Sequence, residues 1–565
     1  MTAYEKNNAN LTTNSYQHAA EFIVHCLENE GVKYVFGLPG EENIKLVRAL
    51  GFSNKIRFIL VRHEQGASFM ADIYGRLTGK AGVCLSTLGP GGINLLLGTA
   101  DAQTDSSPLV AISAQVGLDR IYKETHQMVD LENMFKPITK WAKTIYSVNA
   151  IPEMVRQAFS LAQQERPGAT YLGIPQDIEA LPIPKNLRPL KVTKPQLSAP
   201  NPTEIKQAAY LLLEGKQVVI LAGHGVARQQ AGNTLTKFAQ RHQVPVATTF
   251  MAKGVISDEN ALSLGVIGFM EHDYENFAFD KADVILALGY ELQEFDPKHI
   301  NPNADKTIIH INSFNAEIDT HYDVALDIKA DIQQALLSLS QALNNQPLRQ
   351  INETAKIRQL LQQEREKGKQ SQAFPLLPQR IVEDIRQVLR KDDIVLADTG
   401  AIKMWMARLY PTYTPFGCIF SNGLSTMSFA LPGAIGAKLA KPNNRILAVM
   451  GDGSFLMNAQ EIETAVREKI DLKVLIWVDN SYGLIKWKMD IEEGAHSNVN
   501  FNNPNFVKYA QSFGAHGYEI TQAEELKPTL EKALNEPGVS IIACPVDYKE
   551  NLKLTKKLGE LTVIL

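Results

Sequence analysis

Short apolar runs alternate with segments of helical periodicity along the whole chain. The runs that predict buried strands cover residues 34–37, 58–61, 83–86, 109–112, 170–174, 218–221, 284–288, 307–311, 445–450 and 474–478. Strands that alternate with helices build parallel sheets whose two faces are both covered by helices. The sequence therefore predicts an α/β protein made of doubly wound parallel sheets.

Proline-rich and polar segments divide the chain into three predicted domains. Prolines at 182, 184, 189, 195, 200 and 202 interrupt any regular element, which is typical of an extended linker. A polar helical stretch at about 348–372 separates the second domain from the third. Because 565 residues exceed what one core holds, we expect separate domains over 1–185, 200–345 and 375–565. The central one should be a six-stranded, Rossmann-like domain.

Two aspartates follow neighbouring predicted strands of the third domain. Asp452 lies in a Gly-Asp-Gly turn after the run at 445–450, and Asp479 follows the run at 474–478. Parallel strands end at one edge of a sheet, and Gly453 would let a phosphate approach the backbone there. Mg²⁺ usually takes one or two carboxylates together with phosphate oxygens and water. The pair predicts a magnesium site that holds a diphosphate, whereas two N-cap aspartates are the alternative interpretation.

Glu64 lies at a predicted strand-to-helix junction in the first domain. It follows the apolar run that ends near Val61, and apolar residues at Met70, Ile73 and Leu77 continue with helical spacing. Its side chain is therefore free to project into a cleft. The alternative is an ordinary carboxylate at the start of a helix, which the helix dipole favours.

Charge and composition exclude several classes of protein. The formal charge of −4 comes from 57 basic and 61 acidic residues, and it predicts neither a nucleic-acid partner nor an anionic membrane surface. The four cysteines show no metal-ligand spacing, so we expect buried, reduced thiols. Residues 1–17 lack the apolar core of a secretory signal, and no run of about 18 apolar residues occurs. We expect a cytoplasmic protein without a membrane partner.

These motifs resemble the thiamine diphosphate (ThDP) enzymes. The resemblance implies that the carboxylates of Asp452 and Asp479 and the backbone carbonyl of Ser481 hold Mg²⁺. It also implies that Glu64 bonds the aminopyrimidine ring, so that the cofactor's own imine removes the proton from the thiazolium carbon. The three predicted domains would then bind the pyrimidine, form the central Rossmann-like unit and bind the diphosphate.

The resemblance extends to further positions. Gln127 matches a position that reaches the reacting centre, with a solvated amide at a helix start as the alternative, and Met427 matches the side chain that wedges between the cofactor rings. Leu484, Ile485, Trp487 and Lys488 are candidates for the substrate pocket. The implied contacts of the cofactor are Pro90, Asn94, Thr399, Gly400, Ala401, Ile402, Ser425, Met427, Asp452, Gly453, Ser454, Ser481, Tyr482 and Gly483.

Within the ThDP enzymes the chain is similar to the acetolactate synthases of the catabolic, FAD-independent type. Segment 289–297 departs from the FAD-binding segment of biosynthetic members, and their Gln-Trp pair is absent in register because Lys488 stands at the position of the tryptophan. FAD is therefore not expected. Gly223-His224-Gly225 is only a fragment of a dinucleotide fingerprint and predicts a tight turn. The resemblance implies decarboxylation of pyruvate, condensation of the hydroxyethyl-ThDP carbanion with a second pyruvate to 2-acetolactate, and a homodimer or homotetramer with active sites between chains.

Two other functions stay open. The chain could be another ThDP-dependent 2-oxo acid decarboxylase or carboligase, or a ThDP-binding protein without catalysis. One departure bears on the substrate, because Glu41 and Glu42 stand where catabolic members commonly have Ala-Lys. Two carboxylates beside a site for pyruvate would weaken substrate attraction unless they point away.

Overall fold

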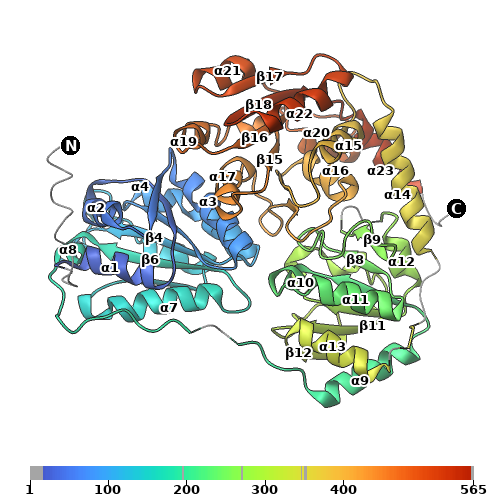
Figure 1. Ribbon diagram of the computed structural model, residues 1–565, viewed down its shortest axis with the longest axis horizontal. Helices are drawn as coiled ribbons and strands as arrows, with labels where there is room; N and C mark the ends of the chain where they lie inside the picture. The colour runs from blue at the N-terminus through green and yellow to red at the C-terminus, as the bar shows by residue number, and fades with distance from the viewer. Residues whose placement is uncertain (1–16, 194–195, 269–271, 345, 349–352, 561–565) are drawn as a thin grey trace. The chain divides into compact units, whose positions relative to one another are not determined.

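The structure is a computed structural model that describes residues 17–193, 196–268, 272–344, 346–348 and 353–560. It divides into two compact units, one made of residues 1–71, 81–103 and 108–194, the other of residues 72–80, 104–107 and 195–565. Three six-stranded parallel sheets form the scaffold, one in the first unit and two in the second (Figure 1). This confirms the predicted α/β fold of three parallel-sheet domains.

The first sheet has the strand order β2-β1-β3-β4-β6-β5. Its strands are β1 (Tyr34–Gly37), β2 (Arg57–Leu60), β3 (Gly82–Ser86), β4 (Leu109–Gln115), β5 (Trp141–Thr144) and β6 (Ala169–Pro175). The helices between them are α1 (Ala19–Asn29), α2 (Ile44–Phe52), α3 (Glu64–Thr78), α4 (Pro90–Asn94), α5 (Leu96–Thr104), α6 (Leu131–Phe135), α7 (Ile151–Gln163) and α8 (Gln176–Ala180). Helices α3 and α4 begin just after β2 and β3, which places their first residues at the carboxyl edge of the sheet.

The second sheet is the central one, with the order β12-β11-β10-β7-β8-β9. Its strands are β7 (Val218–Ala222), β8 (Val246–Thr248), β9 (Ser263–Val266), β10 (Val284–Leu288), β11 (Thr307–Asn312) and β12 (Val324–Lys329). Its helices are α9 (Pro202–Glu214), α10 (His224–Arg228), α11 (Gly232–His242), α12 (Asn276–Lys281) and α13 (Ile332–Ala342). The expected six-stranded central domain is therefore present.

The third sheet has the order β14-β13-β15-β16-β18-β17. Its strands are β13 (Ile394–Ala397), β14 (Cys418–Ile419), β15 (Ile446–Gly451), β16 (Leu472–Val478), β17 (His516–Glu519) and β18 (Val539–Pro545). Its helices are α15 (Pro378–Val388), α16 (Ala401–Leu409), α17 (Ala430–Ala440), α18 (Asp452–Phe455), α19 (Glu461–Arg467), α20 (Gly483–Glu492), α21 (Phe506–Ser512), α22 (Leu526–Asn535) and α23 (Lys549–Glu560). The adjacent pair β15 and β16 brings the two motif aspartates to one edge.

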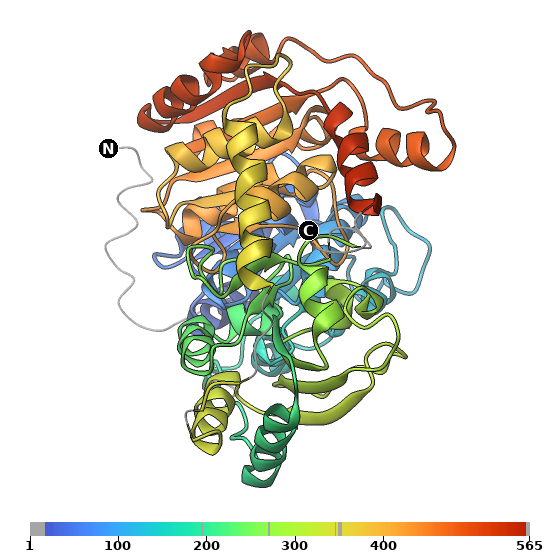
Figure 2. The ribbon, with the colours of Figure 1, turned by 90° about the vertical axis from the view of Figure 1, so that its right-hand side faces the viewer.

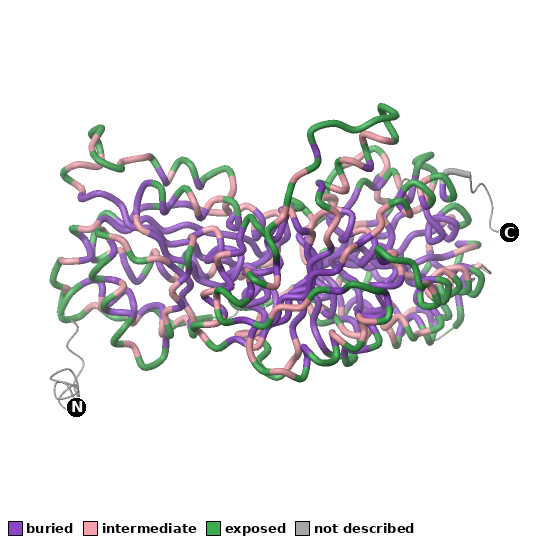
Figure 3. The backbone as a smooth tube through the Cα atoms, turned by 90° about the horizontal axis from the view of Figure 1, so that it is seen from above, coloured by how far each residue is buried: buried purple, intermediate pink, exposed green. Residues whose placement is uncertain are grey.

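The central strands of the three sheets are among the most buried segments of the chain. The strands at the middle of each sheet are buried along all or nearly all of their length, and Figure 3 shows this buried backbone inside exposed connecting segments. Helix α14 (Thr354–Lys369) confirms the polar helical stretch, and it runs lengthwise along the second unit from the central sheet to the third (Figure 2). Its apolar side packs on β9 and on α15.

The structure also bears on the predictions about the linker, the cysteines and membrane crossing. The proline-rich segment between α8 and α9 contains no helix among its described residues, and Pro202 is the first residue of α9. Cys26, Cys84, Cys418 and Cys544 are all buried and free, as predicted. Among the described helices, none combines the length and the apolar content that a membrane crossing needs. Residues 1–16, which carry most of the segment tested for a secretory signal, lie outside the described part.

Candidate functional site

Glu64 is the first residue of α3, directly beyond the edge strand β2. The side chain of Asn94 at the end of α4 donates to Glu64 Oε2 over 3.0 Å. A methyl group on Gly91 would lie 3.1 Å from Glu64 Oε1, so the absence of a side chain at this glycine leaves the space beside the second carboxylate oxygen open. Glu64 is only 5% exposed, and its carboxylate is therefore held in one orientation by α4. The structure brings Glu64 and Asn94 together.

Gln127 lies over the turn that precedes α4. Gly89 has φ +54°, and a Cβ there would meet the carbonyl oxygen of Gln127 at 2.7 Å. Gln127 itself has φ 56°, a left-handed conformation that a residue other than glycine adopts at some cost. Gln127 is exposed, and its backbone packs on the glycine that precedes α4. A role of its side chain at the reacting centre stays a prediction.

Glu42 contacts the same turn. Thr87 donates from Oγ1 to Glu42 Oε2 over 2.7 Å, while Glu41 is exposed. One of the two carboxylates that depart from the catabolic pattern is therefore engaged by a hydroxyl of the turn. The Glu42 carboxylate therefore has a hydrogen-bond donor in the Thr87 hydroxyl.

Asp452 and Asp479 stand at the ends of neighbouring strands. Strands β15 and β16 are parallel and paired up to Gly451 opposite Trp477, so both aspartates leave the sheet at one edge. Asp452 Oδ2 accepts the amides of Asp479 at 3.1 Å and of Asn480 at 2.7 Å. Asn503 donates to the same oxygen over 2.7 Å. The backbone after β16 is therefore wrapped around the Asp452 carboxylate.

Burial and mutual repulsion make this pair of carboxylates costly to ionise. Burial raises the pKa of Asp479 to about 7, and the adjacent Asp452 carboxylate adds to the rise, against the Ser481 hydroxyl that donates to Asp479 Oδ2 over 2.6 Å. Burial also raises the pKa of Asp452. Within the described part of the chain, no group of three His, Cys, Asp or Glu side chains is arranged so that it could hold a metal ion. A cation here would rely on two carboxylates completed by main-chain, phosphate or water oxygens.

Gly453 and Ser454 of the motif are engaged by the protein itself. Gly453 donates its amide to Asp452 Oδ1 over 2.9 Å, and a Cβ at Gly453 would lie 2.9 Å from the Phe501 ring. Ser454 Oγ donates to the buried Asp398 over 2.7 Å. Gly453 is thus required by the covering aromatic ring, in addition to the phosphate approach expected from the sequence.

Asp398 organises the loop between β13 and α16. Its Oδ1 accepts the amides of Thr399 at 2.7 Å and Ser428 at 2.9 Å, and burial raises its pKa to about 7. The hydroxyls of Thr399 and Ser428 are buried and have no hydrogen-bond partner among the described residues. Gly400, at φ +130°, has open space beyond its α-carbon, before Ala401 and Ile402 start α16. Two unsatisfied hydroxyls beside a helix start fit the oxygens of a phosphate group.

The loop that contains Ser425 and Met427 is held in an unusual conformation. Ser425 and Ser428 both have positive φ, at 52° and 70°, and Met427 between them is half-buried. Lys403 of α16 donates to Ser425 Oγ over 3.1 Å and to the Ser421 carbonyl over 2.9 Å. Strain of this kind persists where surrounding contacts impose it. The backbone at both sides of Met427 is accordingly fixed before any ligand binds.

Helix α20 presents the four candidates for the substrate pocket on two faces. Trp487 is buried and donates from Nε1 to Thr555 of α23 over 3.0 Å, and Leu484 packs against the same core. Ile485 is 47% exposed, and Lys488 is also exposed. Tyr482 and Gly483 start this helix, and a Cβ on Gly483 would lie 2.9 Å from Asp479 Oδ2. The exposed face is the one free to meet a substrate, and a pocket role for these residues stays a prediction.

In the central domain, Glu294 closes the turn that follows β7. The His224 amide donates to both Glu294 oxygens, at 3.0 and 3.1 Å, and the Glu291 amide donates to one of them at 3.0 Å. A Cβ on Gly223 would meet Glu294 Oε1 at 2.6 Å. An internal carboxylate therefore occupies the start of α10, where a dinucleotide-binding fold places a phosphate.

Sequence reasoning missed Asp398 and Asn503. Asp398 follows an apolar run at 394–397 and precedes the predicted loop at 399, so a polar residue at the end of a strand was a usable signal. Asn503 donates to Asp452 and, over 2.9 Å, to Asn480 Oδ1. It lies in a loop without hydrophobic periodicity, which gives no sequence signal for its role.

Three family models match successive parts of the chain. The "Thiamine pyrophosphate enzyme, N-terminal TPP binding domain" matches residues 17–134, and the "central domain" of the same enzymes matches residues 205–339. The "C-terminal TPP binding domain" matches residues 398–544. Thiamine pyrophosphate is another name for ThDP, and the outer two matches contain Glu64 and the aspartate pair.

Full-length relatives carry one activity in their names. The acetolactate synthase of Bacillus subtilis (strain 168) is 36% identical, with 99% of each chain aligned. The catabolic acetolactate synthase of Raoultella terrigena is 34% identical over 96% of this chain and 97% of its own. The large subunit of acetolactate synthase isozyme 1 of Escherichia coli (strain K12) is 32% identical over 94% of each chain. The similarity thus covers all three sheets.

Proposed function

The chain belongs to the ThDP-dependent acetolactate synthase family, and on this premise we propose that it decarboxylates pyruvate and joins the two-carbon product to a second pyruvate, releasing 2-acetolactate and CO₂. The observation that carries this proposal is the pair Asp452 and Asp479 at the ends of two adjacent strands, with the Asn480 amide folded onto Asp452. Acetolactate synthesis requires the diphosphate of ThDP to be held in place, and this edge of the third sheet offers a site for it.

The residues that would hold the cofactor fit its chemistry. Asp452, Asp479 and the Ser481 carbonyl would bind Mg²⁺, which in turn takes diphosphate oxygens. The unsatisfied Thr399 hydroxyl and the start of α16 would meet the same diphosphate. When bound, ThDP supplies an acidic thiazolium carbon and an electron sink. The half-buried Met427, between two residues of positive φ, would hold the cofactor's rings in one relative orientation.

Glu64 would control protonation of the aminopyrimidine. Its buried carboxylate is oriented by Asn94, so that one oxygen is fixed and the other is available to a ring nitrogen. Glu64 would hold a carboxyl proton at this oxygen and share it with a ring nitrogen of the bound cofactor. Exposed apolar residues on α20, such as Ile485, would keep water from the reacting carbon, because water would divert the two-carbon product to acetaldehyde.

We also propose that this is a catabolic-type enzyme that works without FAD. The contacts of Glu294 with the amides at the start of α10 support this, because a nucleotide phosphate would have to displace a buried carboxylate. Replacing a carboxyl group that already satisfies these amides brings no net gain in hydrogen bonds. By the same resemblance we propose that the protein assembles as a homodimer or homotetramer with active sites between chains. Light scattering would measure the number of chains in the assembly.

Product analysis tests the reaction. The protein is incubated with pyruvate, ThDP and Mg²⁺, with and without added FAD, and acid treatment converts acetolactate to acetoin for colorimetric detection. We expect acetoin in equal amount in both reactions. Release of CO₂ without acetoin would replace the proposal by a decarboxylase of pyruvate. Turnover of another 2-oxo acid but not of pyruvate would favour the second candidate, a decarboxylase or carboligase for that acid. No turnover of any 2-oxo acid with bound ThDP would leave only a binding protein.

A further inference from the structure

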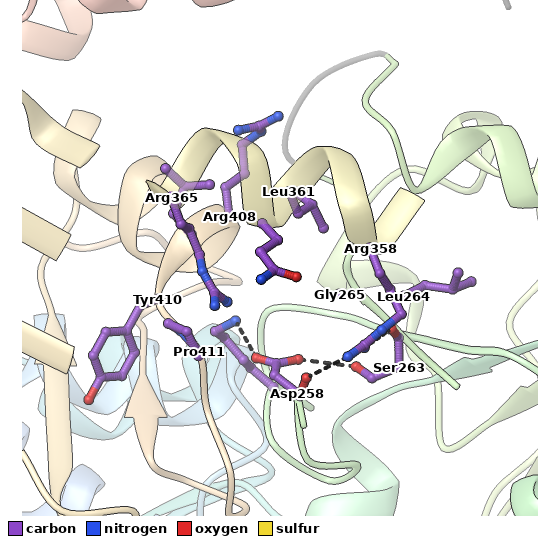
Figure 4. Close-up of a pocket in the computed structure, with 13 residues that line it drawn as sticks. Asp258, Ser263, Leu264, Gly265, Arg358, Leu361, Arg365, Arg408, Tyr410 and Pro411 are labelled. Carbon is purple, nitrogen blue, oxygen red and sulfur yellow. Dashed lines mark hydrogen bonds and ion pairs between the residues drawn. The ribbon is translucent and has the colours of Figure 1, made fainter. Parts of the chain in front are cut away.

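A cavity of about 110 Å³ lies between the central sheet and the third domain, within the second unit. Its walls come from β9, from α14 and from the end of α16 with the residues that follow (Figure 4). None of the residues that line it belongs to the candidate cofactor site. The cavity is therefore separate from the candidate cofactor site.

The walls of this cavity contain more positive than negative side chains. Lys253, Arg358, Arg365 and Arg408 line it together with one carboxylate, Asp258. Lys253 Nζ lies 3.5 Å from Asp258 Oδ2, so these two charges offset each other. The remaining positive charges in the walls belong to the guanidinium groups of Arg358, Arg365 and Arg408.

Arg408 is neutralised from outside the cavity. It donates from Nε to Asp273 over 2.6 Å and forms a second ion pair with Glu364. The side chain of Arg408 is only 1% exposed, as expected for a guanidinium enclosed by two carboxylates. Its charge is therefore already balanced.

Arg358 and Arg365 have no such balance. Arg358 donates only to backbone carbonyls, to Ser263 at 2.7 Å and to Asp258 at 3.2 Å (Figure 4). Arg365 has no hydrogen-bond or ion-pair partner among the residues that the structure describes, and its Nε is buried. Burial lowers the pKa of Arg358, and the proximity of Arg365 lowers it further despite Asp258. Two like charges thus face one cavity, and among the described residues neither forms an ion pair with a carboxylate.

We propose that this cavity binds a small tetrahedral oxyanion of the phosphate class between Arg358 and Arg365. Guanidinium groups pair with phosphate through parallel N–H···O bonds, and a four-oxygen anion can accept from both arginines at once. Pockets for nucleotides or drug-sized ligands are usually about 300–1,000 Å³, so this cavity admits the ion but not a nucleotide.

The expected consequence is a tighter connection between two domains. Arg358 and Arg365 lie two turns apart on α14, the helix that connects the central sheet to the third domain, and the opposite wall includes Leu264 of β9 and Pro411 beyond α16. An anion that bridges α14 would remove the repulsion between the two arginines and stabilise the folded state in proportion to its occupancy. The bound ion should therefore raise the thermal unfolding midpoint.

The test is a thermal-unfolding titration of the holoenzyme. Phosphate is added at constant ionic strength against chloride, with ThDP and Mg²⁺ saturating so that a diphosphate site is already filled. We expect a saturable rise of the midpoint, a similar rise with sulfate, and at least tenfold weaker binding of acetate, which offers fewer oxygens. Arg365→Gln should raise the half-saturating phosphate concentration about tenfold, in line with the loss of one charge-assisted contact. Arg365→Glu should abolish the effect.

Lys356→Gln is the matched control, because it removes one charge from the exposed side of the same helix and should leave the titration unchanged. Arg365 has no partner among the described residues to lose, so both variants at this position are expected to fold. Crystals soaked in phosphate should show the ion between the two guanidinium groups. Equal midpoint shifts in the parent and in Arg365→Glu, or an empty cavity after soaking, would overturn the proposal.

Discussion

The guanidinium of Arg76 donates to the carboxylate of Asp105 over 3.0 Å, and both side chains are almost completely buried. Asp105 also accepts the amides of Asn422 and Gly423, the latter over 2.6 Å, while Arg76 donates to the Phe420 carbonyl over 2.7 Å. The ion pair therefore fixes the backbone at 420–423, immediately before the loop that contains Ser425 and Met427.

Replacement of Asp105 by alanine should destabilise the protein and weaken cofactor binding together. Arg76 would keep its buried ion pair with Asp72, but the amides of Asn422 and Gly423 would lose their acceptor, and a donor left unsatisfied costs about 1–3 kcal/mol. The loop at 420–427 would lose two backbone anchors, so we expect the ThDP concentration at half-maximal activity to rise. Urea unfolding and a ThDP titration measure the two effects. Asp280→Asn, at an exposed carboxylate paired with His272, should change neither; a variant at Asp105 with normal ThDP dependence would contradict the positioning role.

Glu64→Gln should separate turnover from cofactor binding. The amide keeps the shape that Asn94 recognises but cannot exchange a proton, and loss of such a group costs typically 10²–10⁴-fold in rate. Binding of ThDP should persist because the residues proposed to hold the diphosphate lie in the third domain. Steady-state kinetics and fluorescence titration give the two values. Glu204→Gln, in the first turn of α9, tests the simpler interpretation of a carboxylate that only stabilises a helix start. Equal turnover in both variants would support that simpler interpretation.

The predicted strands were all found, and most of them lie inside parallel sheets. Runs such as 284–288 and 474–478 are almost wholly buried, and β10 and β16 confirm them. Among the edge strands β2 was predicted, but others were missed. β5 and β17 alternate between buried and exposed residues or remain largely exposed, so they lack a continuous apolar run. The interior strands β8, β13 and β18 were missed as well.

The candidate site was predictable only where it follows strand ends. Asp452 and Asp479 leave adjacent strands, and the parallel order brings them together without further information. The partners that come from loops were not predictable: Asn503 reaches Asp452 across 51 positions, and Glu294 reaches the His224 amide across 70. Such contacts depend on tertiary packing, which leaves no periodic signal in the sequence.

Asp479→Asn should raise the magnesium requirement. The amide keeps a hydrogen-bond acceptor for the Ser481 hydroxyl but supplies no charge, and a hard divalent cation prefers carboxylate oxygen. We expect the Mg²⁺ concentration at half-maximal activity to increase about tenfold or more, and dialysis against EDTA to remove activity from the parent enzyme until Mg²⁺ returns. Asp490→Asn, a partly exposed carboxylate on α20 paired with His496, is the matched control. Unchanged Mg²⁺ dependence at Asp479 would exclude this residue as a ligand.

Glu364 of α14 should make stability depend on acid pH. Burial alone would raise its pKa, but Arg408 and Lys557 outweigh burial and lower the pKa of Glu364 to about 2. The unfolded value is about 4.3, so the ionised group stabilises the folded state above that pH, and this contribution is lost as the pH falls toward 2. At about 1.4 kcal/mol for each tenfold change in acidity, the contribution at neutral pH is about 3 kcal/mol. Urea unfolding should therefore show that Glu364→Gln is less stable than the parent protein by this amount at pH 7, and that the difference in unfolding free energy shrinks below pH 4. Glu366→Gln, at an exposed position on the same helix, should have the stability of the parent protein throughout. A deficit that stays constant between pH 7 and pH 3 would mean that the carboxylate contributes packing and no charge.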